Sequence, residues 1–289
     1  MKHSVSMTVV LLAFFVVSQL IGVFLLSASM DVKVDSAGVQ SVEFKETILG
    51  SRPEMEPKTS FFSIVSAIIV GTLIVLLIMR LNLVRVWKVW FFLAVSSALS
   101  VAFGVVLPTG VAVVCAVVLA FFKVFRPGVV VQNLAELFIY SGIAVLFVPL
   151  LNVFWMGLLL VVVSLYDAYA VWKSRHMISM AKFQSGSKTF AGVFIPYKKA
   201  VGAKETEKSA ILGGGDIAFP MLFAGVVMSD FIARGLSLPD AVIRALSVVL
   251  FSSLALALLF IRGKEDRFYP AMPFLSLGCA LGYVFALLL

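Results

Sequence analysis

Charged residues are scarce in this sequence. Only 13% of the 289 residues are charged and 62% are hydrophobic, whereas soluble domains average about 25% charged and about 45–50% apolar residues. A water-soluble globule of this composition would expose large apolar patches and aggregate. The composition therefore excludes a soluble enzyme and a nucleic-acid-binding domain, and it indicates a protein of the lipid bilayer.

Cysteine and histidine are also scarce. The two cysteines, Cys115 and Cys279, lie inside apolar runs, which excludes a disulfide framework and a cysteine zinc site. The two histidines, His3 and His176, lie outside the apolar runs, and no HExxH motif occurs. An intramembrane zinc protease would lack its ligands and a membrane serine protease would lack its histidine base. We therefore expect no metal and no cofactor.

Apolar runs fill most of the chain, and a helix needs roughly 20 mainly apolar residues to cross a bilayer. Nine runs qualify and alternation typical of strands is not evident, which predicts an all-α polytopic membrane protein with one domain over residues 1–289. The first run exceeds the usual 7–15 apolar residues of a signal peptide, so we expect a retained helix. The predicted spans are 5–29, 61–79, 88–107, 109–125, 134–150, 152–172, 210–233, 241–261 and 268–289.

Basic residues are distributed unevenly between the two sides that these nine spans define. The side with the N-terminus carries 17 of the 23 Lys and Arg residues. Because basic residues concentrate in cytoplasmic loops, we expect a cytoplasmic N-terminus and an external C-terminus. The segment 30–60 is then an acidic external loop, and the segment 173–209 is a cytoplasmic loop rich in Gly, Ser and Lys. The net charge of +8 is thus a topology signal that requires no nucleic-acid partner.

Two carboxylates lie where a bilayer should exclude them. Asp167 and Asp216 fall inside the sixth and seventh runs, and a charge at a helix centre costs ~2.5–3.5 kcal/mol. Both lie roughly 9–12 Å from the cytoplasmic ends of their helices, at about 1.5 Å per residue. On antiparallel neighbours the two carboxyls would face each other at one level. Glu136, Asp230 and Asp240 lie near span ends, where we expect water or headgroups to solvate them.

A pair of carboxyls at one level suits peptide hydrolysis. Two close carboxyls cannot both ionise, so one keeps a proton while the other is a base. The base removes a proton from the attacking water, and the acid protonates the carbonyl oxygen or the leaving nitrogen. A structural hydrogen-bonded pair, or a relay in a proton-coupled transporter or channel, explains the same residues. A transporter built from inverted halves is weakened because no internal repeat is evident.

Three short segments accompany the aspartates. Gly213, Gly214 and Gly215 open the seventh run; such a run admits water and an extended substrate, or packs closely against another helix. Tyr166 can donate a hydrogen bond or lie at the membrane interface. The segment Pro270-Ala271-Met272-Pro273 opens the ninth run. Its two prolines lack N–H groups, so they leave upstream carbonyls unpaired, which is tolerated at membrane depth where the backbone lines a cavity. Alternatively, they only mark the start of a helix, where proline is common.

Together these residues resemble the GxGD intramembrane aspartyl proteases, the presenilin and signal peptide peptidase family. Tyr166-Asp167 matches the YD motif, and Gly213-Gly214-Gly215-Asp216 matches GxGD. Pro270-Ala271-Met272 matches the PAL motif with Met for Leu, a change that conserves volume. Motif order, span count and the long loop between the aspartates extend the resemblance over the whole chain, which looks like the microbial single-chain members. Prepilin-type peptidases share GxGD but not these other features.

The resemblance implies an intramembrane aspartyl endopeptidase without metal or cofactor. Its catalytic residues would be Asp167 and Asp216, and its substrate-binding residues would be Tyr166, Gly213, Gly214, Gly215, Pro270, Ala271 and Met272. Its partners would be transmembrane polypeptide substrates and the lipid bilayer. The resemblance also implies a multi-pass protein of a microbial plasma membrane.

Two further segments support hypotheses of their own. The run 189–195 is apolar and β-prone, so it either supplies an edge strand to an unwound substrate or anchors a loop at the membrane surface. Gly278 and Gly282 form a GxxxG motif, which favours packing of the last helix inside the bundle over formation of a homo-oligomer.

Overall fold

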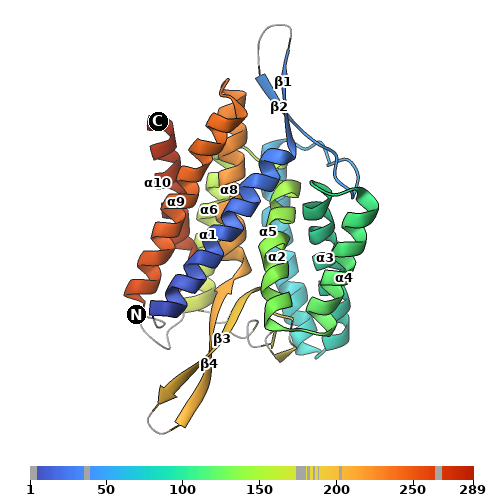
Figure 1. Ribbon diagram of the computed structural model, residues 1–289, viewed down its shortest axis with the longest axis vertical. Coiled ribbons are helices and arrows are strands. Elements are labelled where there is room, and N and C mark those ends of the chain that lie inside the picture. Colours follow the sequence, from blue (N-terminus) through green and yellow to red (C-terminus); the bar gives the residue numbers. More distant parts are fainter. Residues whose placement is uncertain are drawn as a thin grey trace.

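The structure is a computed structural model that describes residues 5–35, 40–173, 180, 183–184, 186–187, 189–201, 204–263 and 269–289. Its helices run along the long axis of the molecule, with a small β-hairpin projecting from each end (Figure 1). The N-terminus lies at the end that carries the hairpin β3–β4, and the C-terminus lies at the end that carries β1–β2. This arrangement agrees with an odd number of crossings.

The helical fold class and the predicted number of helices are confirmed, because the described residues form nine α-helices and one short 3-10 helix, η1. Seven of the α-helices are long and apolar enough to span a membrane, while α4 and α10 have 17 residues each. Seventeen residues span about 25 Å, at the lower limit for a crossing. The helices are α1 Val5–Ala28, α2 Pro57–Arg80, α3 Val84–Gly104, α4 Thr109–Phe125, α5 Val129–Phe147, η1 Val148–Leu150, α6 Val153–Trp172, α8 Gly214–Ala233, α9 Leu238–Arg262 and α10 Met272–Leu288.

Four strands lie in the two long connections, which were predicted to be loops apart from the β-prone run 189–195. Strands β1 (Met30–Val34) and β2 (Gln40–Phe44) form an antiparallel hairpin in the segment 30–60. Strands β3 (Gly192–Val201) and β4 (Lys204–Gly213) form another in the segment 173–209 and beyond. Both hairpins lie outside the helices that are long and apolar enough to span a membrane.

The prediction of a seventh helix over 210–233 was wrong at its start. Residues 210–213 belong to β4, and α8 begins at Gly214. The predicted ninth span at 268–289 likewise begins late, at Met272, after the non-helical segment 269–271. Residues 210–213 form a strand because they pair with β3, whereas Pro273 lacks an N–H and therefore fits the first turn of α10.

Helix α8 occupies the centre of the bundle. It contacts α1, α5, α6, α9 and α10, and it is the most buried of the seven candidate spans. Helix α2, by contrast, is the least buried of them and contacts α3 and α6. The core helix α8 and the helices around it therefore carry the residues that could form a site shielded from lipid.

The GxxxG motif packs α10 against α9 inside the bundle, as the sequence analysis favoured. A Cβ atom on Gly278 would lie 2.7 Å from the carbonyl oxygen of Phe251, and one on Gly282 would lie 2.6 Å from the Cα of Val248. These contacts are with backbone, which cannot move aside as a flexible side chain can. The two glycines thus allow close approach of the helices.

Replacing Gly282 with leucine should therefore lower the free energy of unfolding by about 2 kcal/mol, because the new side chain overpacks the α9–α10 contact. The control is Gly71→Leu in α2, where a Cβ would meet no atom within 4 Å. Denaturant titration in detergent micelles measures both. Equal effects, or a change of oligomeric mass in Gly282→Leu without loss of monomer stability, would contradict the assignment.

Candidate active site

Asp167 is a buried carboxyl near the end of α6, with 5% of the residue exposed. The backbone N–H of Met272 donates a hydrogen bond to its Oδ2 at 3.1 Å, and the backbone of Ala271 supplies another. Both donors belong to the beginning of α10, where the first N–H groups of a helix have no partner inside the helix. Asp167 thus lies at a helix N-terminus, which stabilises negative charge.

The start of α10 is held at this position by its sequence and by a hydrogen bond to α6. Residues 269–271 are not helical, and Pro273 falls in the first turn of α10, where its missing N–H is not needed. One turn further on, the hydroxyls of Ser164 and Ser276 are hydrogen-bonded at 2.8 Å. The predicted PAL-like segment therefore contacts the predicted catalytic residue Asp167.

Asp216 lies in the first turn of α8, and each glycine before it has a different environment. A Cβ on Gly213 would lie 3.1 Å from Oδ2 of Asp216, so the carboxyl folds back over Gly213. A Cβ on Gly214 would lie 2.5 Å from the hydroxyl of Tyr140, whereas one on Gly215 would meet only Phe219 at 3.7 Å. Close packing against another helix, one of the two expected uses of this glycine run, applies to Gly214, which meets Tyr140 of α5.

The backbone after Asp216 is supported from α1. Pro220 lies inside α8 and lacks the N–H that would bond to the carbonyl of Asp216. Gln19 of α1 is fully buried and donates to the carbonyl of Ile217 at 2.8 Å. Because α6, α8 and α10 contact one another, Asp167 and Asp216 lie on neighbouring helices.

Tyr166 connects α6 to α2. Its hydroxyl lies 3.1 Å from Oγ1 of Thr72, which itself donates to the carbonyl of Ile68 at 2.8 Å. Since the proton of Thr72 is already used, Tyr166 is the donor to Thr72. This hydrogen bond holds the YD motif against the least buried helix of the bundle.

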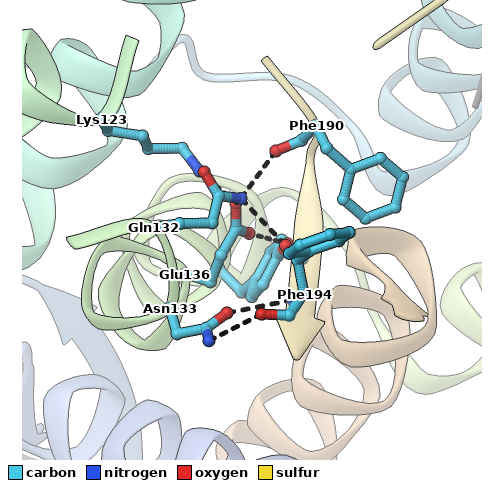
Figure 2. Close-up of polar contacts among 8 residues, drawn as sticks. Lys123, Gln132, Asn133, Glu136, Phe190 and Phe194 are labelled. Atoms are coloured by element: carbon cyan, nitrogen blue, oxygen red, sulfur yellow. Dashed lines mark hydrogen bonds and ion pairs between the residues drawn. The ribbon is translucent and has the colours of Figure 1, made fainter. Parts of the chain in front are cut away.

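The predicted strand at 189–195 is present as β3, but α5 occupies its outer edge. Asn133 accepts from the N–H of Phe194 at 3.0 Å and donates to its carbonyl at 2.9 Å. Gln132 donates to the carbonyls of Phe190 and Gly192 at 2.8 and 3.0 Å (Figure 2). The next outward residue, Pro196, has no N–H to offer. The hypothesis that this run itself adds a strand to the substrate is therefore wrong.

A buried polar cluster on α4 and α5 was missed from the sequence. Glu136 was expected to be solvated near a span end, yet it is buried and paired with Lys123. Gln132 and Tyr140 complete the cluster by donating to the two oxygens of Glu136. The signal available in the sequence was the pair of opposite charges on either side of the Pro127-Gly128 turn, Lys123 before it and Glu136 after it.

Among the residues with described positions, no three His, Cys, Asp or Glu side chains are grouped to hold a metal ion.

Comparisons with known proteins connect this arrangement to one family. The sequence profile of the family described as signal-peptide peptidase, presenilin aspartyl protease matches residues 12–289. Two solved structures, each of a presenilin family intramembrane aspartate protease, share the fold with TM-scores of 0.63 and 0.62 at 15% and 16% identity. The alignments cover 97% and 100% of this chain and 98% of each solved chain. A search among curated proteins finds no match.

The hydrogen bond between Thr72 and Tyr166 can be tested with a double-mutant cycle. We expect Thr72→Val and Tyr166→Phe each to lower the free energy of unfolding by about 1 kcal/mol. The double variant should lose no more than either single variant, because both remove the same bond. Additive losses, measured by denaturant titration in micelles, would show that the two hydroxyls act separately.

Proposed function

The chain belongs to the signal-peptide peptidase, presenilin aspartyl protease family, and on this premise we propose that Asp167 and Asp216 are the catalytic pair of an intramembrane aspartyl protease. Family membership supports proteolysis over the alternative of a proton-coupled transporter or channel. The observation that supports the assignment of residues is the placement of Asp167, buried at the N-terminus of α10, on a helix that contacts the helix of Asp216.

The reaction proceeds by general acid–base catalysis on a water molecule held between the carboxyls. The ionised carboxyl accepts a proton from the water as its oxygen attacks the peptide carbonyl, and the protonated carboxyl donates to the carbonyl oxygen. The carboxyl that took the proton from water then donates it to the nitrogen, the other carboxylate takes a proton from a hydroxyl of the geminal diol, and the C–N bond breaks. The products are a free carboxyl and a free amine, and each aspartate is ready for another cycle.

The substrates are transmembrane helices, whose peptide bonds are hidden in internal hydrogen bonds and must be unwound before attack. An unwound segment at membrane depth needs new partners for its backbone groups. Single-span polypeptides, of type I orientation, fit the topology proposed below. On this proposal the substrate lies between residues 213–215 and 270–272, and Tyr166, the chain neighbour of Asp167, holds α6 against α2 through Thr72.

The free edge of β4 is the place where an unwound substrate adds. The hairpin hydrogen-bonds through pairs such as Val193 with Leu212, and the N–H of Gly214 donates to the carbonyl of Ala191 at 3.2 Å. In an antiparallel ladder the alternate residues of β4 then direct their N–H and C=O groups away from β3. These residues are Ser209, Ile211 and Gly213.

This edge runs directly toward Asp216. Ile211 is 36% exposed, and β4 ends at Gly213, three residues before the aspartate. A substrate strand paired with Ile211 and Gly213 would be led past the carboxyl of Asp216 in an extended form, which is the form that the reaction requires.

The positive-inside asymmetry supports a cytoplasmic N-terminus, so the β3–β4 end, which lies with the N-terminus, would face the cytoplasm of a microbe (Figure 1). The GxxxG motif is used between α9 and α10, so it gives no support to a homo-oligomer.

Cleavage of a fluorogenic transmembrane peptide in liposomes tests the catalytic pair. Asp167→Asn and Asp216→Asn should each lower the rate by about 100-fold or more, while Asp230→Asn at the far end of α8 should retain activity. The wild-type rate should fall at both low and high pH, since one carboxyl must be protonated and the other ionised. Equal rates in wild type and Asp216→Asn, or proton flux without cleavage, would contradict the proposal.

The β4 edge is tested by Ile211→Pro, which removes one outward N–H and leaves the ladder with β3 intact. We expect kcat/KM to fall about tenfold, the loss of roughly one hydrogen bond to the substrate in the transition state. Ile211→Val keeps the N–H and should retain at least half of the activity. Wild-type turnover by a folded Ile211→Pro variant would exclude strand addition at this edge.

A further inference from the structure

A charged pair is buried beside the β3–β4 hairpin, and the proposed reaction does not use it. Lys123, in the last turn of α4, and Glu136, in α5, form an ion pair with side chains 0% and 1% exposed. The ammonium of Lys123 also lies over the ring of Phe91, 5.7 Å from its centroid. Figure 2 shows the pair, with Gln132, directed toward Phe190 and the strand β3 that contains Phe194.

The pair determines which way the amide of Gln132 points. The ammonium of Lys123 donates to Oε1 of Gln132 at 2.8 Å, which fixes this atom as the oxygen and turns the NH2 group toward the remaining acceptors. The NH2 nitrogen lies 2.8 Å from the carbonyl oxygen of Phe190 and 3.0 Å from both the carbonyl oxygen of Gly192 and Oε1 of Glu136, so its two protons are shared among three acceptors. A reversed amide would place an oxygen against those two carbonyls. The charges therefore hold the beginning of β3 in place.

The other oxygen of Glu136 holds Tyr140. The hydroxyl of Tyr140 donates to Oε2 of Glu136, and the tyrosine is 4% exposed. The same hydroxyl lies against Gly214, where a Cβ would approach it to 2.5 Å. Gly214 occupies the position that the GxGD motif leaves open, two residues before Asp216. One carboxylate thus joins the strand on one side to the glycine turn on the other.

Stability alone gives little reason for such a pair. Each charge is expensive to insert at membrane depth, and buried ion pairs can often be replaced by apolar residues without loss of stability. The two neighbours that the pair orients, Gln132 and Tyr140, contact the two segments that lead into Asp216. A role of the pair in placing Asp216 relative to the substrate would explain why two charges are kept at membrane depth despite the cost of inserting them.

We propose that Lys123, Glu136, Gln132 and Tyr140 form a positioning network that sets the place of Asp216 and of the β4 edge relative to the substrate. The inference rests on the proposed function of Asp216 and goes beyond it. The four residues act through the carbonyls of Phe190 and Gly192 and through Gly214, and Tyr140 is also close enough to Asp216 for the two to interact electrostatically. We assign them no proton transfer in the reaction, so they are positioning residues. Their removal should therefore lower kcat without unfolding the protein.

The first variant is the apolar replacement Lys123→Met/Glu136→Leu, which leaves neither charge unpaired. We expect its unfolding midpoint in detergent to stay at or above that of wild type. Its kcat toward the fluorogenic transmembrane peptide, per folded enzyme, should fall about tenfold, because displacements of about 1 Å at a reacting group cost one to two orders of magnitude.

The second variant, Tyr140→Phe, keeps the ring beside Gly214 and loses only the hydroxyl, so it tests the same network with little risk to folding. Its kcat should fall about threefold. The matched control is Asp230→Asn/Arg234→Gln, which removes an ion pair of 2.7 Å at the opposite end of α8 and should leave kcat within twofold of wild type.

Three outcomes would overturn the proposal: wild-type kcat in both network variants, a lowered midpoint with unchanged kcat per folded enzyme, or an equal loss of kcat in the control. These are distinct from failure of the proposed function, in which wild type and Asp216→Asn would already be indistinguishable. The positioning network is supported if both network variants lose kcat, their unfolding midpoints are retained and the control variant stays active.

Discussion

Polar groups at membrane depth must find partners within the protein, and this constraint organises the whole molecule. Asp167 meets it with backbone N–H groups at the start of α10, and those groups are available because residues 269–271 delay the helix. Lys123 and Glu136 meet it with each other. The outer edge of β3 meets it with the side-chain amides of Gln132 and Asn133. In each case a polar group of one segment forms its hydrogen bonds or ion pair with a polar group of another segment. The contacts that assemble the site are therefore the same contacts that lower the cost of placing these polar groups in lipid.

The need to pair polar groups within the protein also explains the central position of α8. Its N-terminal end carries Asp216 and must remain accessible to water and substrate, so the chain enters it from a strand and not from a longer helix. The strand β4 cannot be stable alone, and β3 supports it on one side. Helix α5 in turn contacts β3, so the substrate site that we propose is the edge of β4 that faces away from β3. On this proposal, substrate addition and catalysis lie on consecutive residues of one segment.

Much of this architecture was predictable from the sequence, because apolar length and the cost of buried charge are local properties. The nine helices follow from apolar runs, and Asp167 and Asp216 stood out as carboxyls that lipid cannot solvate. The start of α8 was placed too early because residues 210–213 are apolar enough to continue a helix, and only their pairing with β3 makes them a strand. Glu136 was misjudged for a related reason: its burial depends on Lys123 across a turn and on Tyr140, and distance to a span end does not reveal tertiary burial.

The central claim is that Asp167 and Asp216 act together, and proximity is its most direct test. In a variant without Cys115 and Cys279, the pair Asp167→Cys/Asp216→Cys should be joined efficiently by a short bifunctional thiol reagent in the membrane. The pair Asp167→Cys/Asp230→Cys is the reference, since Asp230 lies fourteen residues further along α8, about 21 Å away along the helix axis. The account predicts a cross-link in the first pair and not in the second. Equal cross-linking of the two pairs, or none in either while the wild type cleaves its substrate, would contradict it.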